Sequence, residues 1–263
     1  MVLIPFFKAS ACGNDFLLVE LDTVPEGSNL PELTRRMCDR HEGIGADGIE
    51  WLSADLETDV KIRLINADGS PAEISGNGTR CVAAHLVSRL GKEQISIRTD
   101  AGVKICRLMA RAGNRYDFEV AMGEPRVGDP FSIKFSFGEP AGVPVSMGNP
   151  HYVIFVDAFY AGWQVEASEI GRHPAFQHGV NVEYVRVENR HAISALFFER
   201  GAGETQSSGT GSCASAVAAI ASGRAESPVE IHTAGGTQVV RWEREVFLTG
   251  SAHMVCQGEF FDL

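Results

Sequence analysis

Two glycine-rich turns carry the residue types best suited to bind an anion. They read Ser75-Gly76-Asn77-Gly78 and Ser208-Gly209-Thr210-Gly211. A turn that opens a helix presents unpaired N–H groups at the positive end of the helix dipole, and glycine lets the backbone approach a ligand closely. Such a turn binds carboxylate or phosphate groups. Because both turns have the pattern S-G-x-G, we expect them to face each other across one cleft and to bind the carboxylate of a small molecule.

A run rich in small apolar residues follows each turn and predicts a helix. The first run extends from Thr79 to Leu90 and ends at Gly91, and the second extends from Ser212 to Ser222 and ends at Gly223. Glycine suits the left-handed position just past a helix end. The second run has no charge and is apolar or small on every side, which predicts a buried helix.

Three pairs of motifs recur at nearly the same spacing along the chain. Ser75 and Ser208 are separated by almost the same number of residues as Asn14 and Asn149. Asn14 lies in the motif Gly13-Asn14-Asp15-Phe16, and Asn149 lies in Gly148-Asn149-Pro150-His151. A weaker pair, residues 41–44 and 178–181, has a closely similar separation. Three near-equal offsets in the same order indicate an internal duplication of half the chain.

Short runs with β-branched or alternating apolar residues predict strands, which outnumber the helices. The βαβ alternation of a doubly wound sheet is missing. We therefore expect an α+β fold with two duplicated domains, each a mostly antiparallel or mixed sheet wrapped around a central helix. Prolines crowd residues 123–145, which we interpret as the crossing between the domains. The predicted strands are Lys61–Ile65, Ile95–Thr99, Tyr116–Met122, Tyr152–Val156, Glu183–Val187 and Gln238–Trp242, with a hairpin turn at Ala112-Gly113-Asn114.

Composition excludes several classes of partner. The formal net charge of −11 argues against a nucleic-acid backbone or an anionic membrane. The apolar run from Val2 to Phe7 is too short for a signal peptide, and no later stretch could span a bilayer, so we expect a cytoplasmic protein. The six cysteines are scattered and show no CxxC pair and no metal-ligand spacing. We expect most of them to be buried free thiols, and we expect no metal site.

Six motifs together closely resemble the diaminopimelate epimerase family, in the family's order and over nearly the whole chain. They are Gly13-Asn14-Asp15-Phe16, Gly43-Ile44-Gly45-Ala46-Asp47-Gly48, Asn66-Ala67-Asp68-Gly69-Ser70, Met147-Gly148-Asn149-Pro150-His151, Gly179-Val180-Asn181-Val182 and Glu199-Arg200-Gly201-Ala202-Gly203-Glu204-Thr205.

The resemblance implies a homodimeric enzyme that epimerises diaminopimelate for lysine and peptidoglycan precursor synthesis, without pyridoxal phosphate, metal or any other cofactor. It also implies that the last strand, around Met254 to Phe261, returns to the first domain. We therefore expect an N-terminal domain of residues 1–122 plus 252–263 and a C-terminal domain of residues 123–251.

The sequence departs from the family at its two catalytic positions. The resemblance implies a cysteine at the start of each turn, one removing the α-proton and the other returning a proton to the opposite face. Here Ser75 and Ser208 occupy these positions, and Cys81 and Cys213 lie farther along on the helices. A thiol of pKa about 8.5 can be lowered towards neutrality at a helix N-terminus, whereas a hydroxyl is far less acidic. We expect two-base epimerisation to be strongly impaired.

Three interpretations stay open. The chain is a diaminopimelate epimerase whose two cysteines have been replaced by serine to trap substrate, or a natural relative that has lost epimerisation. Such a relative would catalyse another reaction at the same α-carbon, such as proton exchange, isomerisation or elimination, with Glu73 or His151 as the base. The third is a binding protein that does no chemistry.

The resemblance also implies a set of substrate-binding residues. Glu199 would meet an ammonium group and Arg200 a carboxylate, in bidentate fashion. His151 would contact a binding residue rather than the substrate. Without the resemblance, asparagine after glycine is an ordinary turn residue. The remaining expected binding residues are Asn14, Asn66, Gly76, Asn77, Gly78, Asn149, Asn181, Gly209, Thr210 and Gly211.

Overall fold

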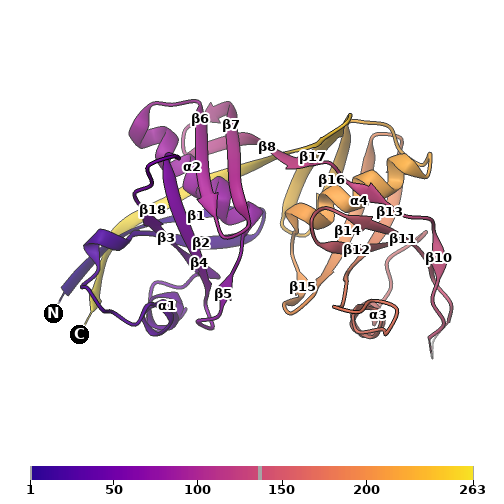
Figure 1. The fold of residues 1–263 in the computed structure, drawn as a ribbon, viewed down its shortest axis with the longest axis horizontal. Helices are drawn as coiled ribbons and strands as arrows, with labels where there is room; N and C mark the ends of the chain where they lie inside the picture. The colour runs from indigo at the N-terminus through magenta and orange to yellow at the C-terminus, as the bar shows by residue number, and fades with distance from the viewer. Residues whose placement is uncertain (1, 136–137, 263) are drawn as a thin grey trace. The chain divides into compact units, whose positions relative to one another are not determined.

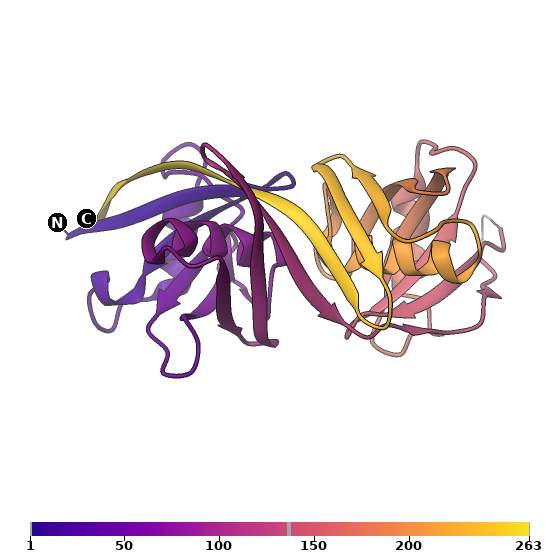
Figure 2. The same ribbon diagram turned by 90° about the horizontal axis from the view of Figure 1, so that it is seen from above.

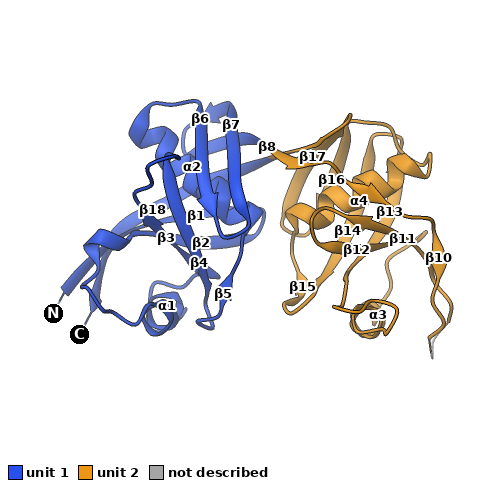
Figure 3. Cartoon of the chain, in the orientation of Figure 1, with its two compact units in different colours: residues 1–120, 250–263 blue, residues 121–249 orange. Residues whose placement is uncertain are grey.

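A computed structural model describes residues 2–135 and 138–262 of the chain. The chain divides into two compact units, residues 1–120 with 250–263 and residues 121–249, coloured separately in Figure 3. We call these parts unit 1 and unit 2 and describe each by itself.

Unit 1 is mostly sheet, with two helices and a short 3-10 turn at Leu21–Thr23 (Figure 1). Its elements are β1 (Val2–Ala11), β2 (Asn14–Glu20), α1 (Leu30–Cys38), β3 (Gly48–Ser53), β4 (Val60–Asn66), β5 (Pro71–Ala72), α2 (Gly76–Leu90), β6 (Gln94–Thr99), β7 (Gly102–Ala112) and β8 (Arg115–Gly123).

Unit 2 has the same kind of composition and ends in a long strand that returns to unit 1. Its elements are β9 (Arg126–Val127), β10 (Phe131–Ser132), β11 (Ala141–Ser146), β12 (Pro150–Phe155), α3 (Trp163–Gly171), β13 (Asn181–Asn189), β14 (Ala192–Glu199), β15 (Gly203–Thr205), α4 (Gly209–Ala221), β16 (Val229–Thr233), β17 (Gly236–Trp242) and β18 (Val246–Asp262).

The two units repeat one order of strand pairings. In unit 1, β1 to β4 pair antiparallel, parallel and antiparallel in turn, then β4 pairs parallel with β6 and β6 antiparallel with β7. In unit 2, the series β11, β12, β13, β14, β16 and β17 repeats these five steps. Each parallel step passes through a helix, as parallel neighbours require. The predicted duplicated α+β fold is confirmed.

Both central helices are buried by the strands of their own unit. Every residue of α2 from Asn77 to Val87 is buried, and so is every residue of α4 from Gly211 to Ala219. Helix α2 contacts β1, β2, β6 and β7, and α4 contacts β11 to β14, β16 and β17. The predicted glycines follow the helices in the left-handed conformation, Gly91 at φ 67° and Gly223 at φ 68°. A helix buried on all sides agrees with its small apolar residues.

Each predicted strand coincides with or overlaps an observed strand; in order, these are β4, β6, β8, β12, β13 and β17. Gly113 lies in the predicted turn between β7 and β8. Among the described residues, no helix has the length and apolar character to cross a membrane.

The chain passes from unit 1 to unit 2 within β8, ahead of the proline-rich stretch 123–145 predicted to make the crossing. That stretch instead forms β9, β10 and the start of β11; Pro125, Pro130 and Pro140 each directly precede a strand, and Pro144 lies within β11. The return is made by β18, which pairs antiparallel with β1 from Val2 opposite Asp262 to Ser10 opposite His253, side by side in Figure 2. The expected returning strand is confirmed and begins earlier, at Val246.

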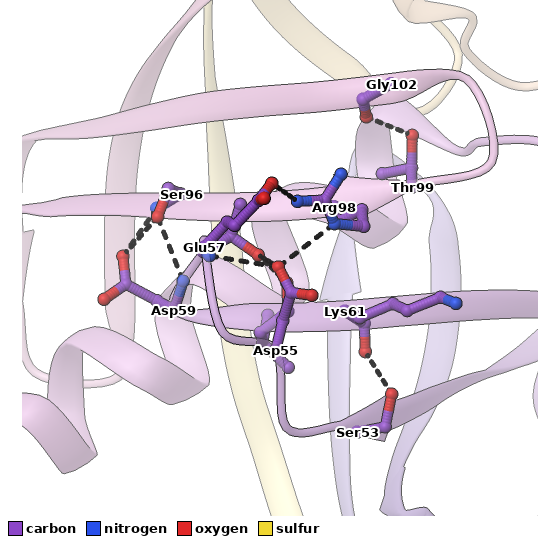
Figure 4. Close-up of polar contacts among 11 residues, drawn as sticks. Ser53, Asp55, Glu57, Asp59, Lys61, Ser96, Arg98, Thr99 and Gly102 are labelled. Atoms are coloured by element: carbon purple, nitrogen blue, oxygen red, sulfur yellow. Dashed lines mark hydrogen bonds and ion pairs between the residues drawn. The ribbon is translucent and has the colours of Figure 1, made fainter.

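A polar network ties the loop between β3 and β4 to β6 (Figure 4). The carboxylate of Asp59 accepts from the backbone N–H of Ser96 at 2.8 Å and from its hydroxyl at 2.7 Å, and it also pairs with Lys92. Arg98 bonds Asp55 at 3.0 Å. Burial acts against ionisation of Asp59, but the bonds from Lys92 and Ser96 lower its pKa to about 2. The ionised form of Asp59 is therefore the one that stabilises the fold.

This lowered pKa gives an acid-dependent stability. The contribution of Asp59 is fully present above its unfolded pKa, about 3.9, and is lost as the pH falls through about 2. We expect Asp59→Asn to lower the free energy of unfolding by about 2 kcal/mol at pH 7 and to have little effect near pH 2. Urea unfolding at both pH values measures this, with Glu57→Gln as control because that side chain is 80% exposed. An equal loss at both pH values would contradict the ionic origin.

Candidate active site

Ser75 and Ser208 are the N-cap residues of the two buried helices. Ser75 Oγ accepts a hydrogen bond from the N–H of Gly78 at 3.1 Å, and Ser208 Oγ accepts one from the N–H of Gly211 at 3.2 Å. Both serines have extended backbone angles, as an N-cap requires. The two turns thus have the predicted form, and each serine oxygen binds an N–H group that would otherwise lack a partner in the helix.

The third residue of each helix is a glycine against which a glutamate packs. A β-carbon at Gly78 would lie 2.0 Å from Glu50 Oε1, and one at Gly211 would lie 2.8 Å from Phe197 Cδ1 and 3.0 Å from Glu183 Oε1. These distances leave no room for a side chain. A glutamate from the neighbouring strand, β3 or β13, therefore lies against the first turn of each buried helix.

Sequence reasoning missed these two glutamates as site residues. Both are buried, and burial raises the pKa of each carboxyl, to about 8 for Glu50. In unit 2 an interaction with His151 partly opposes that increase. A signal was present in the sequence, because the separation of Glu50 from Glu183 is identical to that of Ser75 from Ser208.

In unit 2 a chain of polar contacts connects Glu183 to the helix start. Glu183 Oε1 lies 2.6 Å from His151 Nδ1, and His151 Nε2 lies 3.0 Å from Asn149 Oδ1. Asn149 Nδ2 donates to Thr210 Oγ1 at 3.3 Å. His151 thus contacts Glu183 with one ring nitrogen and Asn149 with the other, which orients the Asn149 amide at the first turn of α4.

The other predicted residues of unit 2 lie around Ser208. The Ser208 hydroxyl donates to Glu199 Oε2 at 3.2 Å, and Thr205 donates to Glu199 Oε1 at 2.7 Å. Asn181 Oδ1 accepts from the backbone N–H of Arg200 at 2.8 Å, and the Arg200 guanidinium donates to the carbonyl of His178 at 2.7 Å. These bonds position the Glu199 carboxylate beside the serine and hold the backbone of Arg200.

Unit 1 brings together a smaller set. Asn77 Nδ2 donates to Asn14 Oδ1 at 2.7 Å, and Asn14 Nδ2 donates to Asp47 Oδ2 at 3.1 Å. Asn77 Oδ1 accepts from Arg80 at 2.5 Å. Arg80 is fully buried on α2 and was not predicted, since an arginine in a helix is ordinarily a solvated residue.

Two candidates of unit 1, Asn66 and Glu73, have no side-chain hydrogen bond to this set among the described residues. Asn66 donates to Ser70 within its own turn at 3.1 Å. Glu73, considered as an alternative base, is exposed in the loop before α2, and the described residues offer it no hydrogen bond or ion pair.

The cysteines on the helices are unsuited to replace the serines. Cys81 and Cys213 are fully buried, and burial raises the pKa of the Cys81 thiol. None of the six cysteines, all within the described residues, forms a disulfide, and five of them are buried, with Cys256 the exposed one. Within residues 2–135 and 138–262, no group of three or more His, Cys, Asp or Glu side chains has the arrangement of a metal site.

The sequence model of the family described as diaminopimelate epimerase matches residues 6–127 and 143–255. The chain belongs to the diaminopimelate epimerase family. A diaminopimelate epimerase of Pelotomaculum thermopropionicum is 39% identical and one of Moorella thermoacetica 36% identical, each alignment covering 97% of this chain and 98% of the relative. Membership makes the chain an isomerase of the epimerase class.

Solved structures with the same fold have other activities in their names. A Bacillus anthracis phenazine biosynthesis protein of the PhzF family has a TM-score of 0.73 at 16% identity, with both chains fully covered. A hydroxyproline epimerase of Agrobacterium vitis, with bound trans-4-hydroxy-L-proline, has a TM-score of 0.73 at 16% identity and covers 98% of this chain and 92% of its own. At such identity these likenesses show the fold alone.

The serine caps give a stability prediction for this epimerase-family fold. We expect Ser75→Ala and Ser208→Ala each to lower the free energy of unfolding by about 1 kcal/mol, because an N–H of a buried helix start loses its acceptor. Urea unfolding measures the change. Ser222→Ala at the exposed end of α4 is the control and should change the free energy by less than about 0.5 kcal/mol. If both serine variants match this control, the serines are not stabilising caps.

Proposed function

We propose that this protein recognises diaminopimelate, in lysine and peptidoglycan precursor synthesis, and that it moves the α-proton only slowly. One observation carries the proposal: both buried helices of an epimerase-family fold begin with a serine, where the resemblance implies the two catalytic cysteines. We further propose a cytoplasmic homodimer without cofactor, as the resemblance implies.

The polar groups of each unit suit an amino-acid substrate. The N-terminal N–H groups of α2 and α4 can bind a carboxylate and stabilise the charge that builds on it when the α-carbon loses its proton. In unit 2 the Glu199 carboxylate, held by Ser208 and Thr205, can accept a bond from an ammonium group. The exposed guanidinium of Arg200 can bind a second carboxylate in bidentate geometry. A substrate with amino-acid groups at both ends meets these requirements.

The serines are poor proton acceptors in these positions. Each Oγ already accepts an N–H bond at its helix start, and the Ser208 hydroxyl donates its proton to Glu199. An alkoxide is inaccessible near neutral pH, whereas a thiolate in the same position would be stabilised by the helix dipole. We therefore expect the protein to bind its substrate but to move the α-proton slowly.

A second candidate function is a different α-proton isomerisation that uses a carboxylate as the base. The observation that favours it is a carboxyl group at each helix start, Glu50 against Gly78 in unit 1 and Glu199 bonded to Ser208 in unit 2. The earlier candidates are less suitable, because Glu73 is exposed in its loop and His151 is engaged at both ring nitrogens. A binding protein without chemistry is the third possibility.

Restoring both thiols tests the proposal directly. We expect Ser75→Cys with Ser208→Cys to interconvert L,L- and meso-diaminopimelate and to exchange the α-hydrogen in deuterated water at least a hundredfold faster than the unchanged protein, because a thiolate replaces a hydroxyl as base. Circular dichroism and proton NMR follow the two reactions.

The matched control places the second thiol one residue away. Ser75→Cys with Ser207→Cys adds the same number of thiols, but Ser207 is not the N-cap of α4. Its epimerisation should remain as slow as that of the unchanged protein, because the thiol at position 75 has no partner thiol at the start of α4. A double variant at positions 75 and 208 that folds, binds diaminopimelate and does not epimerise it would refute the proposed function.

Ligand binding by the unchanged protein is a separate prediction. At a concentration about 100-fold above its Kd, meso-diaminopimelate should stabilise the protein by about 2.7 kcal/mol, seen as a rise in melting temperature. L-Lysine, which lacks the second carboxylate, should give a clearly smaller shift. Arg200→Lys should reduce the difference between the two ligands, because lysine lacks the planar fork of arginine. Equal shifts with both ligands would exclude recognition of the second carboxylate.

A further inference from the structure

A series of hydrogen bonds crosses unit 1 from helix α2 to the loop before β3. The Arg80 guanidinium donates to Asn77 Oδ1 at 2.5 Å, and Asn77 Nδ2 donates to Asn14 Oδ1 at 2.7 Å. Asn14 Nδ2 then donates to Asp47 Oδ2 at 3.1 Å. Two amides expected to bind substrate thus lie in series between an arginine and an aspartate. We call these four side chains the amide chain.

The charged residues at its two ends fix the direction of the amide chain. An arginine side chain can only donate hydrogen bonds and an ionised carboxylate can only accept them, whereas an amide can do either. Asn77 must therefore turn its oxygen to Arg80, and Asn14 must turn its nitrogen to Asp47. Reversing either amide would place two donors or two acceptors face to face, which costs free energy where water is excluded.

The surroundings of each end agree with these roles. Arg80 is 0% exposed, and its bond to Asn77 is the one hydrogen bond to an oxygen that it makes in the part of the chain that the structure describes. Burying a guanidinium without a carboxylate partner is costly, so this bond calls for a purpose. Asp47 also accepts from the N–H of Asp15 at 3.1 Å and from Arg40 at 2.8 Å. Three donors thus face the Asp47 carboxylate.

Unit 2 has neither of the charged ends. Asp47 directly precedes β3 as Val180 directly precedes β13, and the two strands pair with their neighbours in the same register. Arg80 and Cys213 both lie five residues after the N-cap serine of their helix. Val180 and Cys213 are buried and apolar. The charged ends are therefore a property of unit 1 and not of the shared backbone.

The equivalent asparagines of the two units are turned in opposite directions. Asn14 directs its oxygen to Asn77 of α2. Its counterpart Asn149 directs its nitrogen to Thr210 of α4 and its oxygen to His151. The same backbone thus accommodates either orientation of this amide. In unit 1 the arginine and the aspartate select one of them.

We propose that Arg80 and Asp47 are positioning residues that make Asn14 a hydrogen-bond donor to a substrate carboxylate. Asn77 lies in the first turn of α2, so Asn14 lies beside the helix start where a carboxylate is favoured. Asn14 is half-buried, and one of its two Nδ2 hydrogens is used by Asp47. The other is available to the ligand. The inference rests on the proposed function, since it requires an amino-acid ligand at this helix start.

Exchanging the two residues of the Asn14–Asp47 bond tests the direction of the amide chain. Asn14→Asp alone places two carboxylates face to face, and we expect the melting temperature to fall by about 5 °C or more. Adding Asp47→Asn restores a donor opposite an acceptor and should recover about half of that loss or more. Scanning calorimetry measures both changes. If Asn14→Asp does not fold, recovery of a folded protein by the second substitution gives the same support.

The exchanged pair, Asn14→Asp with Asp47→Asn, also separates positioning from folding. It restores the bond but leaves a carboxylate at position 14, which repels a substrate carboxylate. We therefore expect it to bind meso-diaminopimelate about tenfold more weakly than the unchanged protein, or worse, in isothermal titration calorimetry. Arg40→Gln is the control, because it removes a 55% exposed partner of Asp47 and keeps the amide chain. Its affinity should change by less than about twofold.

Two variants test the buried end. Lysine, like arginine, is only a donor and keeps the direction of the Asn77 amide, whereas glutamine can donate or accept and releases it. We expect Arg80→Gln to weaken diaminopimelate binding about threefold more than Arg80→Lys, or by a larger factor. Both variants lose the guanidinium, so a merely structural role would not separate them in this direction.

The results distinguish failure of the positioning from failure of the proposed function. The positioning is overturned if the exchanged pair binds diaminopimelate as tightly as the unchanged protein, or if Asp47→Asn recovers none of the stability lost with Asn14→Asp. Equal binding by Arg80→Gln and Arg80→Lys also overturns it. If neither the unchanged protein nor its Ser75→Cys with Ser208→Cys variant binds diaminopimelate, the proposed function is refuted, and the role of Asn14 with it.

Discussion

The free N–H groups at the start of two buried helices are the constraint on which the structure depends. Water cannot satisfy them where a sheet surrounds the helix, so the chain must supply acceptors. Ser75 and Ser208 provide one acceptor for each helix. A helix start also favours a bound anion, so the constraint that requires the caps supports the proposed carboxylate site. The glycines that let a glutamate lie against each first turn follow from this crowding.

The two units share one order of strand pairings but differ in the side chains at equivalent positions. Equivalent positions hold Phe16 and His151, Gly48 and Asn181, and Asn66 and Glu199, as strand register and the common offset show. In unit 2 these differences produce a connected set of hydrogen bonds from Glu183 to Thr210 and from Ser208 to Glu199. In unit 1 they leave the Glu50 carboxyl and two nitrogens of Arg80 without hydrogen-bond partners in the part of the chain that the structure describes. The two units therefore differ in how completely their buried polar groups are hydrogen-bonded.

The sequence predicted what is decided locally. Helix starts, helix ends, six strands and the duplication follow from turn residues, periodicity and spacing, which act over a few residues. Helices α1 and α3 were not predicted, because neither has the run of small apolar residues that marks α2 and α4. Glu50 and Arg80 were missed for another reason. Charged residues are normally solvated, and only the wrapping of distant strands around α2 buries these two. Glu50 and Glu183 could have been found as a pair, because they are separated by the same number of residues as Ser75 and Ser208.

Serine at the two caps places stability and chemistry in opposition. A hydroxyl oxygen is a strong acceptor for the N–H groups of a helix start, and serine is among the preferred N-cap residues. A thiol is a weaker hydrogen-bonding group, but its anion is accessible near neutral pH. The residue that best caps a buried helix is thus a poor base, and the residue that best removes a proton is a weaker cap. A family that uses these turns for proton transfer must accept less stable helix starts, whereas this chain has the stabilising choice at both of them.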